Sequence, residues 1–389
     1  MTVKNEISLL KNEVIELRRD FHMYPEIGFD LPETSRKVSD YLRKIGLKVQ
    51  NKVGKSGVVG FLEGKNDGKT IMLRADMDAL PIEEKNNIPY KSKIKGKMHA
   101  CGHDGHTAML LVAAKILSAH KDEIKGNIKF AFEPSEEKHP GGAIAMIEDG
   151  VMENPHVEKA YGLHLGNMYP AGTIGICPGV FSAEPDLFAL RIKGKGGHGA
   201  YPHLSIDPII IASEIVLGLQ TIVSREMDPL DPVVISIGKI QSGDAFNIIP
   251  EYAEIIGTIR TFKRETAVII AEKIKRISQN IGAAFRGEVE MSDYIFGYPP
   301  VVNNPIETDL IKDIAKTVIG KDNIIEIVPS MVGEDMSYFL EKAPGAFYWL
   351  GSQNVTKGLD KPHHSPYFNF DEDVLTIGVE MHVRTALGV

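Results

Sequence analysis

Cysteine is scarce in this sequence: among 389 residues only Cys101 and Cys177 are cysteines, which is too few for a disulfide framework. Apolar runs of the roughly 18 residues that a membrane-spanning helix needs are absent as well. The first residues, MTVKNEISLLKNEVIELRR, lack the apolar core of a signal peptide. These absences predict a soluble protein of the reduced cytoplasm with no membrane partner.

Excess positive charge is also missing. The formal net charge is -8 at pH 7, whereas a nucleic-acid-binding surface needs a basic stripe. We therefore expect no nucleic-acid partner. The hydrophobic fraction of 43% and the charged fraction of 25% are ordinary for a globular protein, and a chain of this length predicts two domains.

The rhythm of apolar runs predicts a large α/β domain. From about residue 56 to 176, short apolar runs alternate with helical patterns, which favours a mostly parallel sheet with helices on its faces. The helices are expected to start near Gly105 and Gly142. The candidate strands of this region are residues 58–62, 70–75, 128–132, 160–164 and 173–176.

From about Asp186 the rhythm changes, which indicates a second, smaller domain. Its expected elements are a strand, a helix, two strands, a helix and a strand, over residues 187–192, 208–223, 233–240, 252–259, 265–281 and 288–292. This order is the split unit of ferredoxin-like α+β domains. Because α/β alternation resumes after Asn303, we expect residues 185–294 to be inserted into a domain formed by residues 1–184 and 295–389.

The densest chemical segment is the run MHACGHDGHT, which spans residues 98–107. It holds one cysteine, three histidines and an aspartate at the expected start of a helix. Thiolate and imidazole together suit zinc and the neighbouring transition metals. A cluster of this density is hard to explain by packing alone.

Three further segments place ligand-type side chains at strand ends or in loops. Glu136 and Glu137 follow the strand at 128–132, and His164 ends the strand at 160–164. Open α/β sheets bind ligands at the carboxyl ends of their strands. A Pro-flanked loop before the last helix carries His363 and His364. Taken singly, His164 is as easily explained as a structural histidine, but together these segments predict a metal site.

Two features of the inserted domain stand apart. His198 lies in the glycine-rich run GKGGHGA at residues 194–200, where no helix-capping fingerprint follows, so a nucleotide site is not favoured. Arg260 ends a predicted strand. It has the geometry to bind a substrate carboxylate through two hydrogen bonds, but a surface arginine explains it equally well.

The order and spacing of these motifs resemble the aminoacylase/carboxypeptidase family of metallohydrolases. The motifs are Cys-Gly-His-Asp-Gly-His, Glu-Glu after a strand, Gly-Leu-His, Gly-Gly-His-Gly-Ala and His-Ser-Pro. More narrowly they resemble the amidohydrolase branch, which contains hippurate hydrolases, indole-acetyl-amino-acid hydrolases and N-acetyl-diaminopimelate deacetylases. The resemblance covers nearly the whole chain, from FHMYPE at residues 21–26 through RADMDAL at 74–80 to the last helix.

The resemblance implies two divalent metal ions, with zinc, manganese, nickel and cobalt all left open. The metal ligands it implies are Cys101, His103, Glu137, His164 and His364. It implies that Glu136 is the general base and acid, that Asp78 orients ligands, and that His198 stabilises the carbonyl oxygen, often across a dimer interface. It implies substrate contacts from Asn247 and Arg260. The inserted domain would then be a lid and the contact surface of a homodimer.

The sequence departs from the resemblance near the two glutamates. Relatives commonly have small residues after this pair, whereas this chain has Lys138 and His139, and Glu133 stands where a glutamine is common. These differences bear on the shape of the substrate pocket.

The predicted function is hydrolysis of the amide bond of N-acyl amino acids, which releases a carboxylic acid and an amino acid. Carboxypeptidase or dipeptidase action on short peptides is the alternative, because both reactions cleave an amide near a free carboxylate. A cysteine hydrolase with Cys101 as nucleophile would leave the other ligand-type residues idle. A binding protein without turnover is disfavoured because Glu136 is present.

Overall fold

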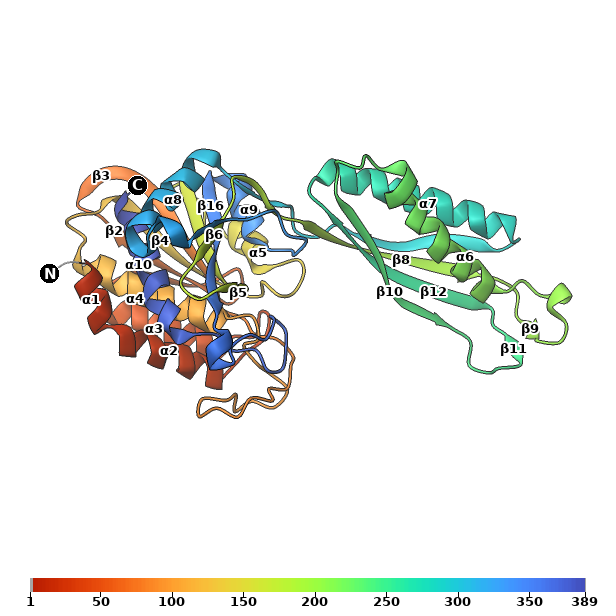
Figure 1. Ribbon diagram of the computed structural model, residues 1–389, viewed down its shortest axis with the longest axis horizontal. Helices are drawn as coiled ribbons and strands as arrows, with labels where there is room; N and C mark the ends of the chain where they lie inside the picture. Colours follow the sequence, from red (N-terminus) through yellow and green to blue (C-terminus); the bar gives the residue numbers. More distant parts are fainter. Residues whose placement is uncertain (1–2, 389) are drawn as a thin grey trace. The chain divides into compact units, whose positions relative to one another are not determined.

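The computed structural model describes residues 3–388 and divides into two compact units (Figure 1). The first unit comprises the described residues up to Phe181, together with Val301–Val328 and the residues from Asp335 onward. The second unit is Ser182–Pro300 with the short segment Pro329–Glu334. The expected insert of residues 185–294 is therefore extended by a few residues at each end. The segment 329–334, which belongs to the insert, was not expected.

An eight-stranded sheet forms the centre of the first unit, in the order β1-β2-β4-β3-β5-β16-β6-β15. The pairs β4–β3, β3–β5, β5–β16 and β6–β15 are parallel, so the prediction of a mostly parallel sheet is confirmed. These strands are β1 Lys48–Val53, β2 Gly57–Glu63, β3 Asn66–Asp76, β4 Lys125–Glu133, β5 Lys159–Pro170, β6 Ile174–Ile176, β15 Ile324–Glu326 and β16 Gly345–Gln353.

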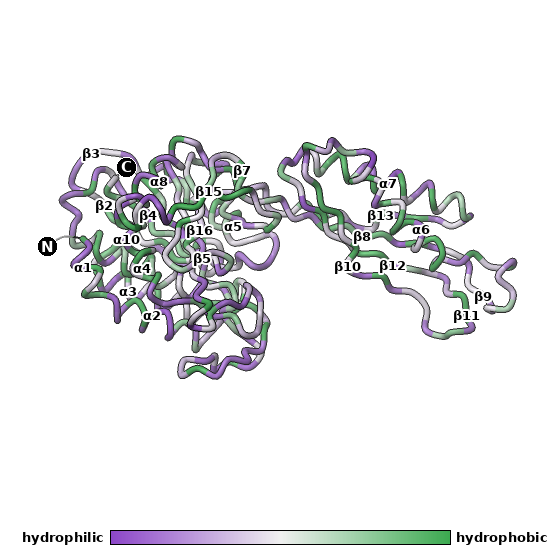
Figure 2. Tube along the Cα trace, in the orientation of Figure 1, coloured by the Kyte–Doolittle hydropathy of each residue, from purple (hydrophilic) through white to green (hydrophobic). Residues whose placement is uncertain are grey.

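Helices cover both faces of this sheet, because successive strand residues point to opposite faces. Leu73 packs in the core under α2, α3, α4 and α10, whereas its neighbour Met72 packs in a second core with α5 and α9. Hydrophilic stretches lie on the outer helices α2 and α3 as well as in the peripheral turns (Figure 2). The helices of this unit are α1 Val3–Leu9, α2 Lys11–Met23, α3 Pro32–Lys44, α4 His103–Ala119, α5 Gly142–Glu148, α8 Pro305–Ile319, α9 Met336–Lys342 and α10 Leu375–Gly388.

The second unit has the expected β-α-β-β-α-β order. Its antiparallel sheet runs β10-β12-β8-β13, and alternate apolar residues such as Leu190 and Ile255 pack against α6 and α7. A small ribbon pairs β9, Gly197–His198, with β11, Ile248–Ile249, inside the glycine-rich region. The main elements are β8 Glu184–Lys193, α6 Pro208–Thr221, β10 Val233–Ser242, β12 Tyr252–Thr261, α7 Arg264–Ala284 and β13 Glu288–Ile295.

One helix of the described residues meets the length and hydropathy of a membrane span, namely α6 with the turn that continues it, Pro208–Glu226. Core helices of globular domains pass the same criterion. Only 33% of the apolar window is buried within this chain, so much of its apolar surface faces outward.

Candidate metal site

The segment before α4 brings its side chains to the carboxyl edge of the sheet. Gly102 has a left-handed φ of 97°, which turns the chain into the helix. His103 and His106 follow at i and i+3 and are both buried. Gly105 allows the helix to approach the sheet closely, because a Cβ there would lie 2.8 Å from Leu165 Cδ1.

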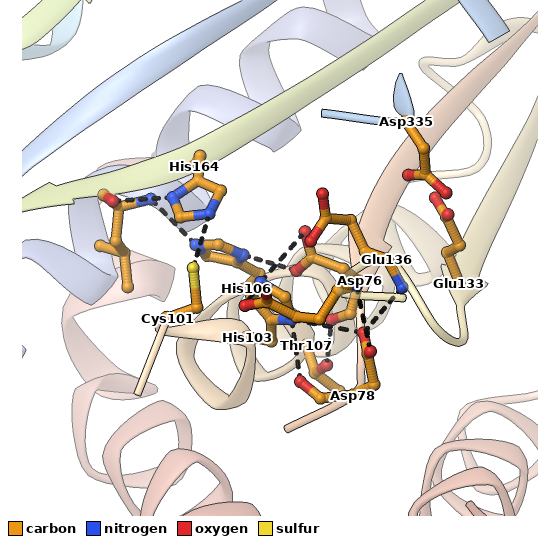
Figure 3. A network of polar contacts seen from close by, with 12 residues as sticks. Asp76, Asp78, Cys101, His103, His106, Thr107, Glu133, Glu136, His164 and Asp335 are labelled. Carbon is orange, nitrogen blue, oxygen red and sulfur yellow. Dashed lines mark hydrogen bonds and ion pairs between the residues drawn. The ribbon is translucent and has the colours of Figure 1, made fainter. Parts of the chain in front are cut away.

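The two glutamates after β4 are held by Asp78. Its carboxylate accepts the backbone N–H of Glu136 at 3.0 Å and that of Glu137 at 3.2 Å. The backbone carbonyl of Asp78 accepts Nδ1–H of His103 at 2.8 Å. Ser135, just before the pair, has the strained φ of 60°. Asp78 therefore fixes three of the predicted site residues (Figure 3).

His164 and His364 complete the cluster from distant parts of the chain. Cys101 Sγ lies 3.4 Å from His164 Nε2, and His364 Nε2 lies 3.2 Å from Glu137 Oε1. The backbone N–H of His364 donates to Ala100 O at 2.8 Å, which joins its loop to the segment before α4. His164 was expected at the end of a strand, but β5 continues to Pro170 because it pairs with β16 along its length.

These side chains form groups with the spacing of metal ligands. Donor atoms lie within 4.8 Å of one another in the group Cys101, Glu137 and His364, and also in the group His103, Glu136 and Glu137. All six residues that were predicted as metal ligands or general base thus meet at one place. Sequence reasoning missed Asp76, which lies with His103, His106 and His164 in a further group. Its position at the carboxyl end of β3 was the available signal.

The donor atoms fit a metal ion. His103 Nε2 is buried and forms no hydrogen bond among the described residues, and it lies 3.8 Å from Asp76 Oδ2 and 3.9 Å from Glu137 Oε1. Burial lowers the pKa of His103, but Asp76, Asp78 and Glu137 outweigh it and raise the pKa to about 10. A positive charge is therefore favoured at this point, and a metal ion supplies one.

The electrostatics disfavour Cys101 as a nucleophile. Burial raises the pKa of its thiol well above the ordinary value, and the carboxylates of Glu137 and Glu136 raise it further. Nucleophilic cysteines need the opposite shift. Burial lowers the pKa of His164 well below its ordinary value, and the neighbouring His106 adds to this. A neutral imidazole is the form that binds metal.

A buried arginine supports the floor of the site. Arg74 donates to Glu133 at 2.6 Å, to Asp76 at 2.8 Å and to Asp335 at 3.0 Å, and all four side chains are excluded from solvent. Figure 3 shows Glu133 and Asp335 on the side of the cluster where Glu136 lies. The glutamate at position 133 is thus part of an ion-pair network, which sequence reasoning treated only as a departure from relatives.

The three residues predicted to act from the second unit, His198, Asn247 and Arg260, do not all lie together. His198 pairs with Ile248 in the β9–β11 ribbon, and the carbonyl of Asn247 accepts the N–H of Gly199 at 2.8 Å, so His198 and Asn247 are neighbours. Arg260 lies at the other end of β12. Its guanidinium donates to the carbonyls of Met331 and Ile259, and it forms no ion pair with any described residue.

Comparison with known proteins identifies the class. The model of peptidase family M20/M25/M40 matches residues 72–388, and the chain belongs to this family. Thermostable carboxypeptidase 1 of Saccharolobus solfataricus is 42% identical over 99% of this chain and 97% of its own length. N-acetyl-L-cysteine deacetylase of Bacillus subtilis is 39% identical over 96% of this chain and 89% of its own length.

A solved structure supports the metal content. A dinuclear metal binding peptidase of the M20 family from Bacillus subtilis superposes with a TM-score of 0.84 at 34% identity, covering 98% of both chains. Together with the cluster of ligand atoms, these relationships make this chain a metal-dependent amidohydrolase that uses two divalent metal ions.

Proposed function

We propose that this protein hydrolyses the amide bond of N-acyl amino acids and that Cys101, His103, Glu137, His164 and His364 hold its two metal ions. The observation that carries the proposal is the orphaned Nε2 of His103, buried among carboxylates at the meeting point of the other ligand-type side chains. The Nδ1 atoms of His103 and His164 each donate a hydrogen bond to a backbone carbonyl. Proteins commonly orient histidine ligands of metal ions in this way.

Glu136 is the proton carrier in this proposal. Divalent metal ions supply an acidified water and polarise the scissile carbonyl. Glu136 accepts the proton of that water and returns it to the leaving amine. Asp78 holds the backbone of Glu136, so the carboxylate is positioned before substrate arrives.

Arg260 is proposed to bind the free carboxylate of the substrate. Its guanidinium is half-buried and bonded only to uncharged groups among the described residues. Burial lowers the pKa of Arg260, and Asp186 opposes this shift. A substrate carboxylate would compensate its charge through a bidentate pair. Both an N-acyl amino acid and a short peptide carry such a group.

A substrate panel separates deacylase from peptidase action, which the relative named carboxypeptidase keeps open. We expect N-acetyl and N-benzoyl amino acids to have higher kcat/KM than dipeptides with the same carboxyl-terminal residue. Methyl esters of the same acyl amino acids lack the carboxylate and should show raised KM. In Arg260→Ala this difference should disappear, because the contact is made before the transition state. Faster turnover of dipeptides would assign the protein to the peptidases instead.

His198 and Asn247 are proposed to act in the site of a second copy. The strand β12 joins the Arg260 end of the second unit to the end that carries the ribbon, and from Tyr252 to Arg260 it spans roughly 25–30 Å. One small substrate is too short to contact both His198 and Arg260 of the same chain. In a homodimer the substrate can contact Arg260 of one chain and His198 of the other, because a two-fold axis brings one end of each unit toward the other subunit.

The second unit has the surface for such pairing. Large apolar side chains of α6 point outward, with Leu217 66% and Ile210 49% exposed. The strand β10 is an edge strand of the sheet, and Ile240 on it is 54% exposed. Exposed apolar patches next to an open sheet edge are typical of subunit interfaces.

The cytoplasmic location is part of the same proposal, and it is supported by the two free cysteines.

Mixing two inactive variants tests the shared site. Glu136→Gln and His198→Ala homodimers are each expected to be nearly inactive. After subunit exchange, the mixed dimer contains one site with an intact Glu136 and a His198 from the partner chain, so activity should return. If His198 serves its own chain, the mixture stays inactive. Unfolded-and-refolded wild type provides the control for the exchange procedure.

A further inference from the structure

His106 sits at the centre of the ligand cluster, yet both of its ring nitrogens are used within the protein. Its Nδ1 lies 2.6 Å from Asp76 Oδ1, and its Nε2 lies 2.9 Å from the backbone nitrogen of Leu165 (Figure 3). An amide N–H only donates, so Nε2 must be the acceptor and Nδ1 must carry the proton that Asp76 accepts. This neutral tautomer has no lone pair left for a metal ion.

The backbone of Leu165, to which His106 is hydrogen-bonded, also binds two other histidines of the site. Strand β3 pairs with β5 only as far as Arg74 and Gly162, so the N–H of Leu165 lies beyond that ladder and His106 supplies its acceptor. The carbonyl of Leu165 accepts Nδ1–H of His164 at 2.7 Å and Nε2–H of His363 at 2.9 Å.

Three imidazoles therefore share one residue's backbone. His164 is a proposed ligand, and His363 precedes the proposed ligand His364. A shift of the Leu165 peptide would rotate the His164 ring and displace the loop that carries His364. The Asp76–His106 pair ties the Leu165 backbone to α4 and to the end of β3.

We propose that His106 is a positioning residue, which fixes the Leu165 peptide and thereby the His164 ligand, and that it does not coordinate metal. The inference rests on the proposed metal site. It separates His106 from His103, although both occur in the same short motif and both lie within ligand distance of Asp76 and His164.

Two substitutions of His106 distinguish the roles. Glutamine places a carbonyl oxygen near the position of the imidazole Nε2, whereas asparagine reaches only the position of Nδ1. His106→Gln should therefore keep an acceptor for Leu165, and His106→Asn should lose it. We expect the zinc dissociation constant, measured by competition with a chromophoric chelator, to rise roughly 10–100-fold in His106→Asn and much less in His106→Gln. Both variants should still bind two zinc ions at saturation.

The matched control is His382, another buried imidazole, which lies on α10 and whose Nε2 forms no hydrogen bond with any described residue. His382→Asn and His382→Gln should leave the zinc dissociation constant unchanged. Wild-type protein that binds fewer than two zinc ions would reject the metal-site proposal itself. Loss of one zinc equivalent in both His106 variants would make His106 a ligand, and equal affinities of the two variants would also overturn the positioning role.

A measurement on the wild-type protein also tests whether His106 coordinates zinc, without any substitution. In histidine-labelled protein, ¹⁵N NMR should show Nε2 of His103 and His164 shifting on zinc addition. The Nε2 of His106 should keep the signal of an unprotonated, hydrogen-bonded nitrogen. A zinc-induced shift of that signal as large as that of His103 would contradict the proposal.

Discussion

Removal of the metal ions should abolish amide hydrolysis. The buried cluster holds the carboxylates of Asp76, Glu136 and Glu137 beside a thiol whose pKa is raised, and no side chain there is an activated nucleophile. Without a cation, neither an acidified water nor a polarised carbonyl is available. Dialysis against a strong chelator, followed by assay with an N-acetyl amino acid, measures the loss.

Adding back zinc, manganese, cobalt or nickel should restore turnover, and the rates will rank the metals. Treatment with iodoacetamide is the opposing test. Full activity of the chelated protein, combined with inactivation by iodoacetamide, would make Cys101 the nucleophile and remove the two-metal mechanism.

Glu136→Gln should lower kcat by roughly 10²–10⁴, the usual worth of a general acid–base group. The amide is isosteric with the carboxylate but does not accept a proton. Its backbone N–H still reaches Asp78, so the segment should keep its position. We therefore expect metal content and melting temperature close to those of the wild type, with a loss that falls mainly on kcat.

The neighbouring Glu137→Gln is the matched control. Glu137 belongs to two of the groups that contain proposed metal ligands, so its substitution should reduce metal content as well as activity. Glu136→Gln protein with empty metal sites would exchange the roles of the two glutamates.

The fold was largely predictable because its strands are apolar runs bounded by polar turns. The elements missed were those with weak patterns. The strand β1 reads KVQNKV and lies exposed at the edge of the sheet, so it has little apolar periodicity. The segment Pro329–Glu334 joins the second unit by long-range pairing, such as the N–H of Ala183 with the carbonyl of Val332. No local sequence signal encodes such a contact.

The sequence predicted which types of residue form the site, but it did not predict the role of each one. A motif with three histidines does not reveal which nitrogen remains free. His103 and His106 differ because one Nε2 faces carboxylates and the other faces the Leu165 amide. Arg74 was quoted only as part of a motif, because the three carboxylates around it come from distant segments. The separation of His198 from Arg260 also required the register of β12.

The strand order has a consequence for biosynthesis. β5, which carries His164, pairs with β16, and β16 is made only after the whole second unit. His364 emerges later still. At about 5–20 residues per second, roughly 10–50 s pass between the synthesis of Cys101 and that of His364. During this interval the nascent chain exposes an incomplete set of ligands, so metal loading is expected to follow the synthesis of His364. Cys101 is most open to oxidation before then.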